Sequence, residues 1–320
     1  MESNTITVNL SSIFPEVLQQ VPGDVKLFPH QVDCVKWLVE RERLADVSEE
    51  DPANPLRSSL LGDVMGLGKT MSTVSLLSVN VVERTLVICP KSLVYQWIRE
   101  LFSQNHNVYL IEPNYARRCI VDNGRVHIFK EKLDHVELVA PFVCVTSYGK
   151  VKPFPEPKHE DEVCISVFDC VSESNRDAQP PKLTPFNSIV WNRIVVDEVH
   201  NLRNGMSLNE DKSAQLRKKS LRFYRLLRLR KTVKCVRLGL TGTPLQNRIG
   251  DLASVFLFLG CYVSRMTDKR DLEQLISKNM FRRSVDNLSD LTKAIIKLTL
   301  STRPESACSL QNLTMKREFK

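Results

Sequence analysis

The chain has 320 residues, of which 42% are hydrophobic and 26% charged, and its formal net charge is +8. This length and composition predict one large apolar core with appendages. The apolar runs fall far short of the roughly 18 residues that span a bilayer, and residues 1–20 lack the basic start and apolar block of a secretion signal. The nine cysteines include no Cys-x-x-Cys pair, which favours reduced thiols over a zinc site. We therefore expect an intracellular protein, nuclear or cytoplasmic, with no membrane partner.

Composition along the chain predicts its domain organisation. Residues 1–24 form an N-terminal extension, residues 25–260 form the main domain, and residues 261–320 form a helical extension. Two polar stretches interrupt the main domain. Residues 42–57 predict an exposed loop, and residues 150–186, with six prolines and seven acidic residues, predict a mobile loop or linker.

A glycine-rich loop occupies Gly62–Thr70. Leu60 and Leu61 predict a short buried strand before it, and a helix opens at Thr70. Gly66 and Gly68 let successive backbone N–H groups point at an anion, Lys69 adds charge for β/γ-phosphates, and the Thr70 hydroxyl suits Mg²⁺. The helix N-terminus adds partial positive charge. Taken alone, the loop is equally compatible with an ordinary turn before a helix.

Two further strands follow in chain order. Residues 86–89 predict a buried strand, then a turn at Lys91-Ser92 and an amphipathic helix whose apolar face includes Trp97. Residues 143–148 predict a strand that ends in Thr146-Ser147-Tyr148. Small hydroxyl residues there are compatible with phosphate contacts or with ordinary turn chemistry.

Residues 194–196 form a continuous apolar run, typical of a strand buried on both faces, and Asp197-Glu198-Val199-His200 follows it. Adjacent carboxylates rarely enter a core unpaired. A solvated turn is the simpler interpretation of this pair by itself. Together with the phosphate loop, the pair predicts a nucleoside triphosphatase in which Asp197 holds Mg²⁺ and Glu198 orients and deprotonates water.

Residues 212–237 contain eleven Lys or Arg and no acidic residue. Leucines at helical spacing predict a basic amphipathic helix here. Its basic face is compatible with a solvated surface, a nuclear import signal or a phosphate-contacting surface, of which we favour the last. After it, residues 238–247 predict a strand that enters a tight Thr241-Gly242-Thr243-Pro244 turn.

These segments, in this order, resemble the first motor lobe of the Swi/Snf-type, superfamily-two DNA translocases. The resemblance runs from about Leu27 to Leu259 and is carried by Met-Gly-Leu-Gly-Lys-Thr at 65–70 and Leu-Thr-Gly-Thr-Pro-Leu-Gln-Asn at 240–247. Residues 191–204 look closest to the branch of transcription-termination-factor and helicase-like-transcription-factor ATPases, and viral global transactivators look similar. The resemblance implies an α/β fold: a RecA-like P-loop lobe with a predominantly parallel sheet and helices on both faces.

The resemblance also implies roles. Gln31, in Leu27-Phe28-Pro29-His30-Gln31, corresponds to the residue that contacts adenine. The residues implied to bind the phosphates are Asp63, Val64, Met65, Gly66, Leu67, Gly68, Lys69 and Thr70. Thr70 and Asp197 are implied to bind the metal ion. Lys69, Asp197 and Glu198 are implied to be catalytic. The DNA-tracking positions are Lys91, Ser92, Thr146, Ser147, Tyr148, Thr241, Gly242 and Thr243. The implied cofactors are ATP and Mg²⁺, and the implied partner is double-stranded DNA bound without sequence preference, which favours the nucleus.

Three departures from the family pattern stand out. Val64 replaces an acidic residue and Val199 an alanine, and neither change removes a catalytic group. The double arginine that follows the first lobe in this family has its counterpart, in our alignment, at residues 300–304, with most of its charge lost.

The residues after Leu259 are too few for a second α/β lobe of about 100–150 residues. In the family that lobe supplies a transition-state arginine, so we expect a single motor lobe that binds ATP–Mg²⁺ but hydrolyses it slowly without a second lobe or protein partner. The alternative is a non-catalytic DNA- or partner-binding remnant that keeps the nucleotide pocket as a structural or regulatory site. A small-molecule kinase is disfavoured by the Thr-Gly-Thr-Pro turn.

Overall fold

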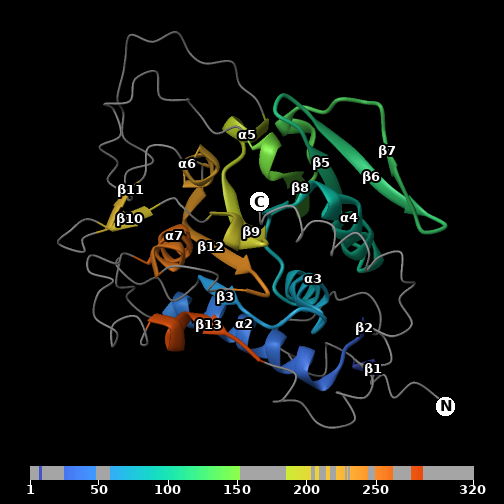
Figure 1. Ribbon diagram of the computed structural model, residues 1–320. Coiled ribbons are helices and arrows are strands. Elements are labelled where there is room, and N and C mark those ends of the chain that lie inside the picture. The colour runs from blue at the N-terminus through green and yellow to red at the C-terminus, as the bar shows by residue number, and fades with distance from the viewer. Residues whose placement is uncertain are drawn as a thin grey trace, which may run out of the picture.

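A computed structural model describes residues 7–8, 25–47, 58–151, 185–202, 206–208, 214–216, 221–227, 229, 231–243, 249–261 and 275–283. The described residues form a nine-stranded sheet in the order β13-β3-β12-β9-β4-β8-β5-β6-β7 (Figure 1). Its strands are β3 Ser59–Leu61, β4 Arg84–Cys89, β5 Val108–Ile111, β6 Ala116–Asp122, β7 Arg125–Ile128, β8 Phe142–Ser147, β9 Trp191–Asp197, β12 Lys231–Leu240 and β13 Met280–Phe281.

The sheet is parallel from β13 to β5, and the hairpin of β6 and β7 adds two antiparallel pairs, β5 with β6 and β6 with β7. Two small antiparallel pairs stand apart from it. They are β1 Thr7–Val8 with β2 Val25–Lys26, and β10 Met206–Leu208 with β11 Ala214–Leu216. The predicted α/β class with a mostly parallel sheet is confirmed.

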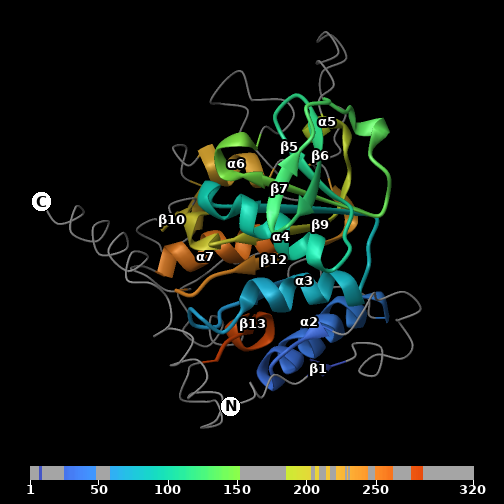
Figure 2. The same cartoon turned by 90° about the vertical axis from the view of Figure 1, so that its right-hand side faces the viewer.

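Helices cover both faces of the sheet (Figures 1 and 2). The α-helices are α2 Pro29–Val47, α3 Lys69–Val79, α4 Val94–Ser103, α5 Pro185–Ser188, α6 Leu221–Leu227 and α7 Ile249–Leu259. Short 3₁₀ turns are η1 Lys91–Leu93, η2 His135–Glu137, η3 Tyr148–Lys150 and η5 Val199–Leu202. None of the helices in the described ranges is long and apolar enough to cross a membrane.

The central strands are apolar on both faces because each face has its own core. In β9, Val195 packs with the cluster under α2, α3 and α4, whereas Ile194 and Val196 belong to the cluster under α5, α6 and α7. Successive side chains of a strand point to opposite faces, which explains why a parallel central strand carries an unbroken apolar run. The amphipathic face predicted for α4 is confirmed, with Trp97 and Ile98 buried.

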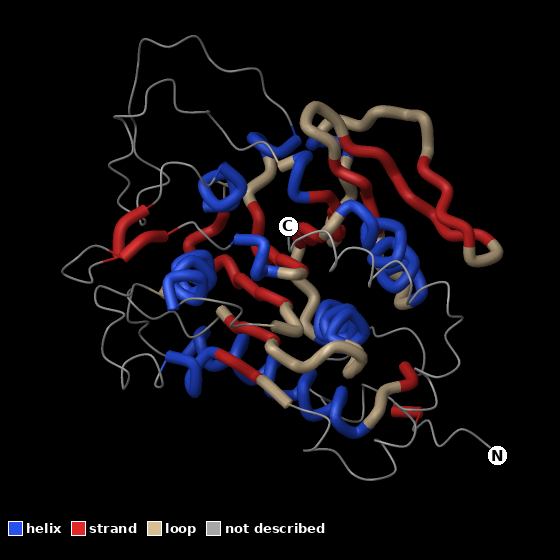
Figure 3. The backbone as a smooth tube through the Cα atoms, viewed as in Figure 1, coloured by secondary structure: helices blue, strands red, loops and turns tan. Residues whose placement is uncertain are grey.

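Two local predictions are wrong. The basic stretch 212–237 is helical only at α6, because β11 takes part of it and β12 begins at Lys231 (Figure 3). Pairing of β12 with β3 and β9 on its two sides overrides the helical spacing of the leucines. The loop predicted over 42–57 begins too early, since α2 continues through Val47; residues 48–57 lie outside the described residues.

Glu42 shows why α2 continues. Its carboxylate is buried and forms an ion pair with Arg193 of β9, whose Nε donates to Glu42 Oε1 over 3.0 Å. Arg193 is also fully buried, and it donates to the backbone carbonyl of Asn80 over 2.9 Å. A polar residue that appeared to belong to a solvated loop therefore fastens α2 to the centre of the sheet.

We predict that Arg193→Met destabilises the fold by about 3–5 kcal/mol, because the Glu42 carboxylate is then buried without a counter-charge. The double variant Glu42→Met/Arg193→Met should lose less than the single variant. Urea unfolding followed by circular dichroism measures both. Equal losses in the single and double variants would contradict the assignment of the cost to the unpaired charge.

Candidate nucleotide site

The parallel order β3-β12-β9 brings three predicted motifs to one edge of the sheet. The glycine loop follows β3, the Thr241–Thr243 turn follows β12, and Asp197 ends β9. The ends of these three strands are level with one another, since Leu240 of β12 pairs with Leu61 of β3 and with Asp197 of β9. Carboxyl ends of parallel strands are where ligands bind in open α/β sheets.

The loop has the backbone that its glycines predict. Gly66 and Gly68 have φ values of 93° and 79°, a region that other residues rarely adopt. Gly68 immediately precedes α3, so that Lys69 and Thr70 form the first turn of the helix. Lys69 Nζ turns back over the loop and donates to the carbonyls of Asp63 at 2.8 Å and Val64 at 3.3 Å.

Lys69 lies in the field of the acidic motif. Burial lowers the pKa of its ammonium group, and the negative charges of Glu198, Asp197 and Asp63 oppose that shift. The ammonium group and the acidic motif, 128 residues apart in the sequence at the nearest point, are thus electrostatically coupled at one site.

Asp197 is buried and held at both carboxylate oxygens. The Trp97 indole N–H donates to Oδ2 over 2.9 Å, and the Glu198 backbone N–H donates to Oδ1 over 2.9 Å. Burial raises the pKa of Asp197, while the Trp97 hydrogen bond works in the other direction. Each oxygen keeps a second lone pair, so the carboxylate remains able to accept another ligand.

Glu198 has φ 51°, a left-handed conformation unusual for a residue with a Cβ. Its carbonyl is the acceptor that fixes this turn. The Tyr148 hydroxyl lies 3.1 Å from it and 2.6 Å from the Asp197 carbonyl, and Asn201 Nδ2 donates to the Glu198 carbonyl over 2.9 Å. The backbone strain of one residue is thus stabilised by two side chains from outside the strand.

His200 connects the acidic motif to the turn after β12. Its Nδ1 lies 3.1 Å from Glu198 Oε2 and 3.0 Å from Thr241 Oγ1. Thr241 Oγ1 in turn accepts from the Thr243 backbone N–H over 3.1 Å. A continuous polar chain therefore runs from the Glu198 carboxylate to the Thr-Gly-Thr turn.

Gln31 sits at the start of α2, against the loop. Its Oε1 accepts from the Phe28 backbone N–H over 2.9 Å, and its Nε2 lies 3.5 Å from the Leu67 carbonyl. A Cβ added at Gly68 would stand 2.1 Å from Gln31 Nε2 and would displace this amide, and the φ of 79° at Gly68 is itself one that other residues rarely adopt. The structure thus brings the predicted adenine residue into contact with the phosphate loop.

The predicted DNA-tracking residues fall into two groups. Lys91, Ser92 and Thr243 are exposed. Thr146 and Tyr148 are buried, and both hydroxyls donate to backbone carbonyls, that of Thr146 to Ile111 over 2.9 Å. The exposed residues are the ones whose polar groups face solvent.

Sequence reasoning missed three residues of this site. Trp97 was assigned only to an apolar face, His200 was given no role, and Arg283 was not considered. Arg282-Arg283 directly follows β13, whereas residues 300–304, where the family's double arginine was expected, lie outside the described residues. A strand-like Met280-Phe281 pair before two arginines was the pattern that could have located Arg283.

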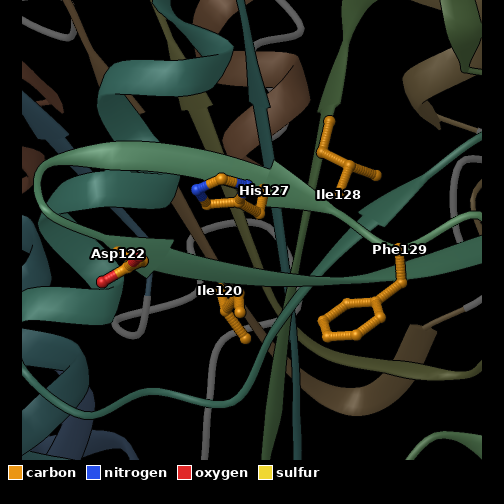
Figure 4. Close-up of a pocket in the computed structure, with 5 residues that line it drawn as sticks. All are labelled: Ile120, Asp122, His127, Ile128 and Phe129. Carbon is orange, nitrogen blue, oxygen red and sulfur yellow. The ribbon is translucent and has the colours of Figure 1, made fainter.

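An open cavity of about 370 Å³ lies elsewhere, on the β6–β7 hairpin, lined by Ile120, Asp122, His127, Ile128 and Phe129 (Figure 4). None of these residues belongs to the strand-end site. The hairpin is the antiparallel margin of the sheet and is separated from β9 by β4, β8 and β5. The site residues predicted from the sequence therefore lie away from this hollow.

Comparisons with known proteins identify a family and several relatives. The SNF2-related domain family matches residues 30–318. The chain is 31% identical over 225 residues to the DNA repair protein RAD5 of Debaryomyces hansenii, covering 64% of this chain and 16% of that protein. It is 24% identical over 288 residues to the ISWI chromatin-remodeling complex ATPase ISW1 of Saccharomyces cerevisiae, covering 88% of this chain and 20% of that protein.

The chain thus spans a fifth or less of the length of these two relatives. Among solved structures, the UvsW helicase from bacteriophage T4 aligns over 87% of this chain and 69% of its own, with 12% identity and a TM-score of 0.41. A score that low carries no argument. The branch expected from residues 191–204 remains a prediction.

We predict that Tyr148→Phe destabilises the chain by about 1–3 kcal/mol, because the buried Asp197 carbonyl at the end of β9 loses this donor and the Glu198 carbonyl loses one of its donors. Tyr95→Phe is the matched control, since Tyr95 is 54% exposed on α4. Chemical denaturation of both variants is the measurement. A Tyr148→Phe protein as stable as the Tyr95→Phe protein would show that the hydroxyl does not support the strand end.

Proposed function

The chain belongs to the SNF2-related domain family, and on that premise we propose that it forms the ATP-binding lobe of a Swi/Snf-type, DNA-dependent ATPase acting in chromatin or DNA transactions. One observation carries the proposal. The Lys69 ammonium group lies in the field of both Asp197 and Glu198, at the ends of β3 and β9, beneath a loop whose glycines have positive φ. A cation and a glycine loop at a helix N-terminus, with a carboxylate pair nearby, are what a nucleoside triphosphate requires.

The residues have distinct roles in this proposal. Lys69 leaves the carbonyls of Asp63 and Val64 to contact the β/γ-phosphates, and the amides from Gly66 to Thr70 surround them. Gln31 contacts adenine from α2. Glu198 orients the attacking water and accepts its proton, and His200, at 3.1 Å, holds the Glu198 carboxylate in place.

The donors present suit Mg²⁺. Thr70 supplies a hydroxyl and Asp197 a carboxylate, both oxygen ligands of the kind this ion prefers. The described part of the chain contains no cluster of three or more His, Cys, Asp or Glu that could hold a metal. Such a sparse set fits an ion whose remaining ligands are phosphate oxygens and water. When bound, the ion would neutralise phosphate charge; Thr70 and Asp197 would hold it.

DNA contact is proposed through the exposed residues at the same edge. Lys91, Ser92 and Thr243 present an ammonium group and hydroxyls to solvent, groups that contact phosphates without distinguishing bases. The His200–Thr241 contact joins this turn to the acidic motif. Movement of the Thr241–Thr243 turn on DNA would therefore reach Glu198 through two polar contacts. Double-stranded DNA and a nuclear site of action follow from this proposal.

The described residues form one lobe, and we propose that a second lobe or a protein partner completes the ATPase by supplying a transition-state arginine. Such arginines contribute on the order of 10³–10⁵ in rate. The chain alone should bind ATP–Mg²⁺ and turn it over slowly. A non-catalytic, regulatory pocket is the second candidate; the intact Lys69, Asp197 and Glu198 favour the first.

We predict that Lys69→Ala abolishes saturable binding of fluorescent ATP, because the loop then lacks its charge for the β/γ-phosphates. Glu198→Gln should keep the affinity and lose the slow hydrolysis. Titration, followed by turnover with and without DNA, tests both. Robust DNA-stimulated turnover by the purified chain would refute the need for a second lobe, and absence of ATP binding by the folded wild type would refute the proposed function.

We predict that Trp97→Phe raises the Mg²⁺ concentration required for ATP binding by about 10-fold or more, because Asp197 loses the hydrogen bond that orients it. Trp191→Phe is the matched control, since Trp191 is fully buried at the other end of β9. The measurement is ATP affinity across a Mg²⁺ series. Equal shifts in both variants would mean that only core packing was disturbed.

A further inference from the structure

β13 extends the sheet beside the strand that leads into the phosphate loop, and its contacts continue into the loop itself. Gly62 N–H donates to the Phe281 carbonyl over 2.7 Å, and Val64 N–H donates to the Arg283 carbonyl over 3.2 Å. The Arg283 N–H donates to Asp63 Oδ1 over 2.7 Å. Residues 280–283 therefore run along residues 60–64, although the two segments are about 220 positions apart in the sequence.

The Arg283 side chain contacts two halves of the nucleotide site. One terminal nitrogen donates to Asp63 Oδ2 over 2.9 Å, and the other donates to the backbone carbonyl of His30. The guanidinium also lies 4.5 Å from the centre of the Phe281 ring. The side chain of Arg283 is 15% exposed and that of Asp63 is 3% exposed, so the ion pair is largely shielded from water.

Each partner of Arg283 is next to a group that the proposed function uses. The carbonyl of Asp63 accepts a hydrogen bond from Lys69 Nζ, so the position of Asp63 affects the position of the Lys69 side chain. His30 immediately precedes Gln31, and its ring Nε2 lies 3.2 Å from the Leu67 carbonyl in the loop. The planar, forked guanidinium is suited to bridging two acceptors in fixed geometry.

β13 also packs on α2 through aromatic rings. Phe281 and Trp37 have ring centroids 5.2 Å apart, and Asn279 Oδ1 accepts from the Arg41 guanidinium over 2.6 Å. Residues 279–283 thus touch α2 at three separate points along its length, at His30, Trp37 and Arg41. The segment fixes the helix that carries Gln31 relative to the loop that carries Lys69.

From this geometry we infer that Arg283 is a positioning residue of the nucleotide site, which holds the phosphate loop and the adenine helix at the spacing required by ATP. The inference rests on the proposed function. It adds that docking of β13 and binding of ATP stabilise each other, because a coupling between two sites acts equally in both directions. Asp63 accordingly acts through its ion pair and its backbone, with its carboxylate directed at Arg283.

The test is the affinity of the full chain for a fluorescent ATP analogue with Mg²⁺, at a temperature where circular dichroism shows each variant to be folded. Arg283→Met should raise the Kd about 10- to 100-fold, as loss of an outer hydrogen-bond partner does at other ligand sites. Arg283→Lys should give a smaller rise, because a point charge cannot bridge both acceptors. Arg282→Met, at the exposed neighbour, is the matched control and should keep the wild-type Kd.

A purely structural role predicts a different result. In that case Arg283→Met lowers the melting temperature but binds ATP with the wild-type Kd, which overturns the inference and leaves the proposed function intact. Failure of the wild type itself to bind ATP defeats the proposed function instead. If Arg283→Met does not fold, the Kd of Arg283→Lys for the ATP analogue is compared with that of the wild type. An unchanged Kd in this folded variant overturns the inference.

Hydrogen exchange on the wild type gives a second readout. Saturating ATP should slow exchange of the Gly62, Val64 and Arg283 amides, the donors that join β13 to the loop. Unchanged exchange at these amides with ATP bound would overturn the proposed coupling.

Discussion

The need to compensate buried charge governs the catalytic edge of this sheet. Asp63 and Asp197 are buried and Lys69 is partly buried, and each has a hydrogen-bond partner. Lys69 donates to carbonyls of its own loop, whereas Asp63 pairs with the Arg283 guanidinium and Asp197 with the Trp97 indole, both distant in sequence. An unpaired charge in these positions would cost several kcal/mol. The partners therefore fix the geometry of the edge, because few arrangements satisfy all of them together.

The same constraint organises α2, which spans the site from one side. Its first turn carries Gln31, its middle packs on Phe281, and Glu42, farther along, is paired with Arg193 inside β9. A helix held at both ends cannot shift along its axis without breaking a buried ion pair or a loop contact. The position of Gln31 is thus determined by contacts of α2 with β9 and β13 as much as by its own sequence.

Much of the fold and of the candidate site could be predicted from the sequence because local patterns carried them. The continuous apolar runs around Val87 and Val195 indicated buried parallel strands, and glycines with a following Lys-Thr indicated the loop. What could not be predicted was long-range. Lys231–Arg237 follows leucines at helical spacing and becomes a strand because it pairs with β9, and Glu42 looks solvated until Arg193 is found opposite it. No local pattern pairs Asp63 with Arg283.

The polar contacts also help to distinguish a site that hydrolyses ATP from a site that only binds nucleotide. A pocket kept only for binding needs the loop, but it has no need to strain Glu198 into a left-handed conformation or to place His200 between Glu198 and Thr241. Strained backbone is maintained where the surrounding structure stabilises it, here through Tyr148 and Asn201. Val64 and Val199, the apolar departures from the family pattern, leave these contacts intact. The arrangement of the acidic motif therefore favours retained ATPase chemistry over a purely structural nucleotide site.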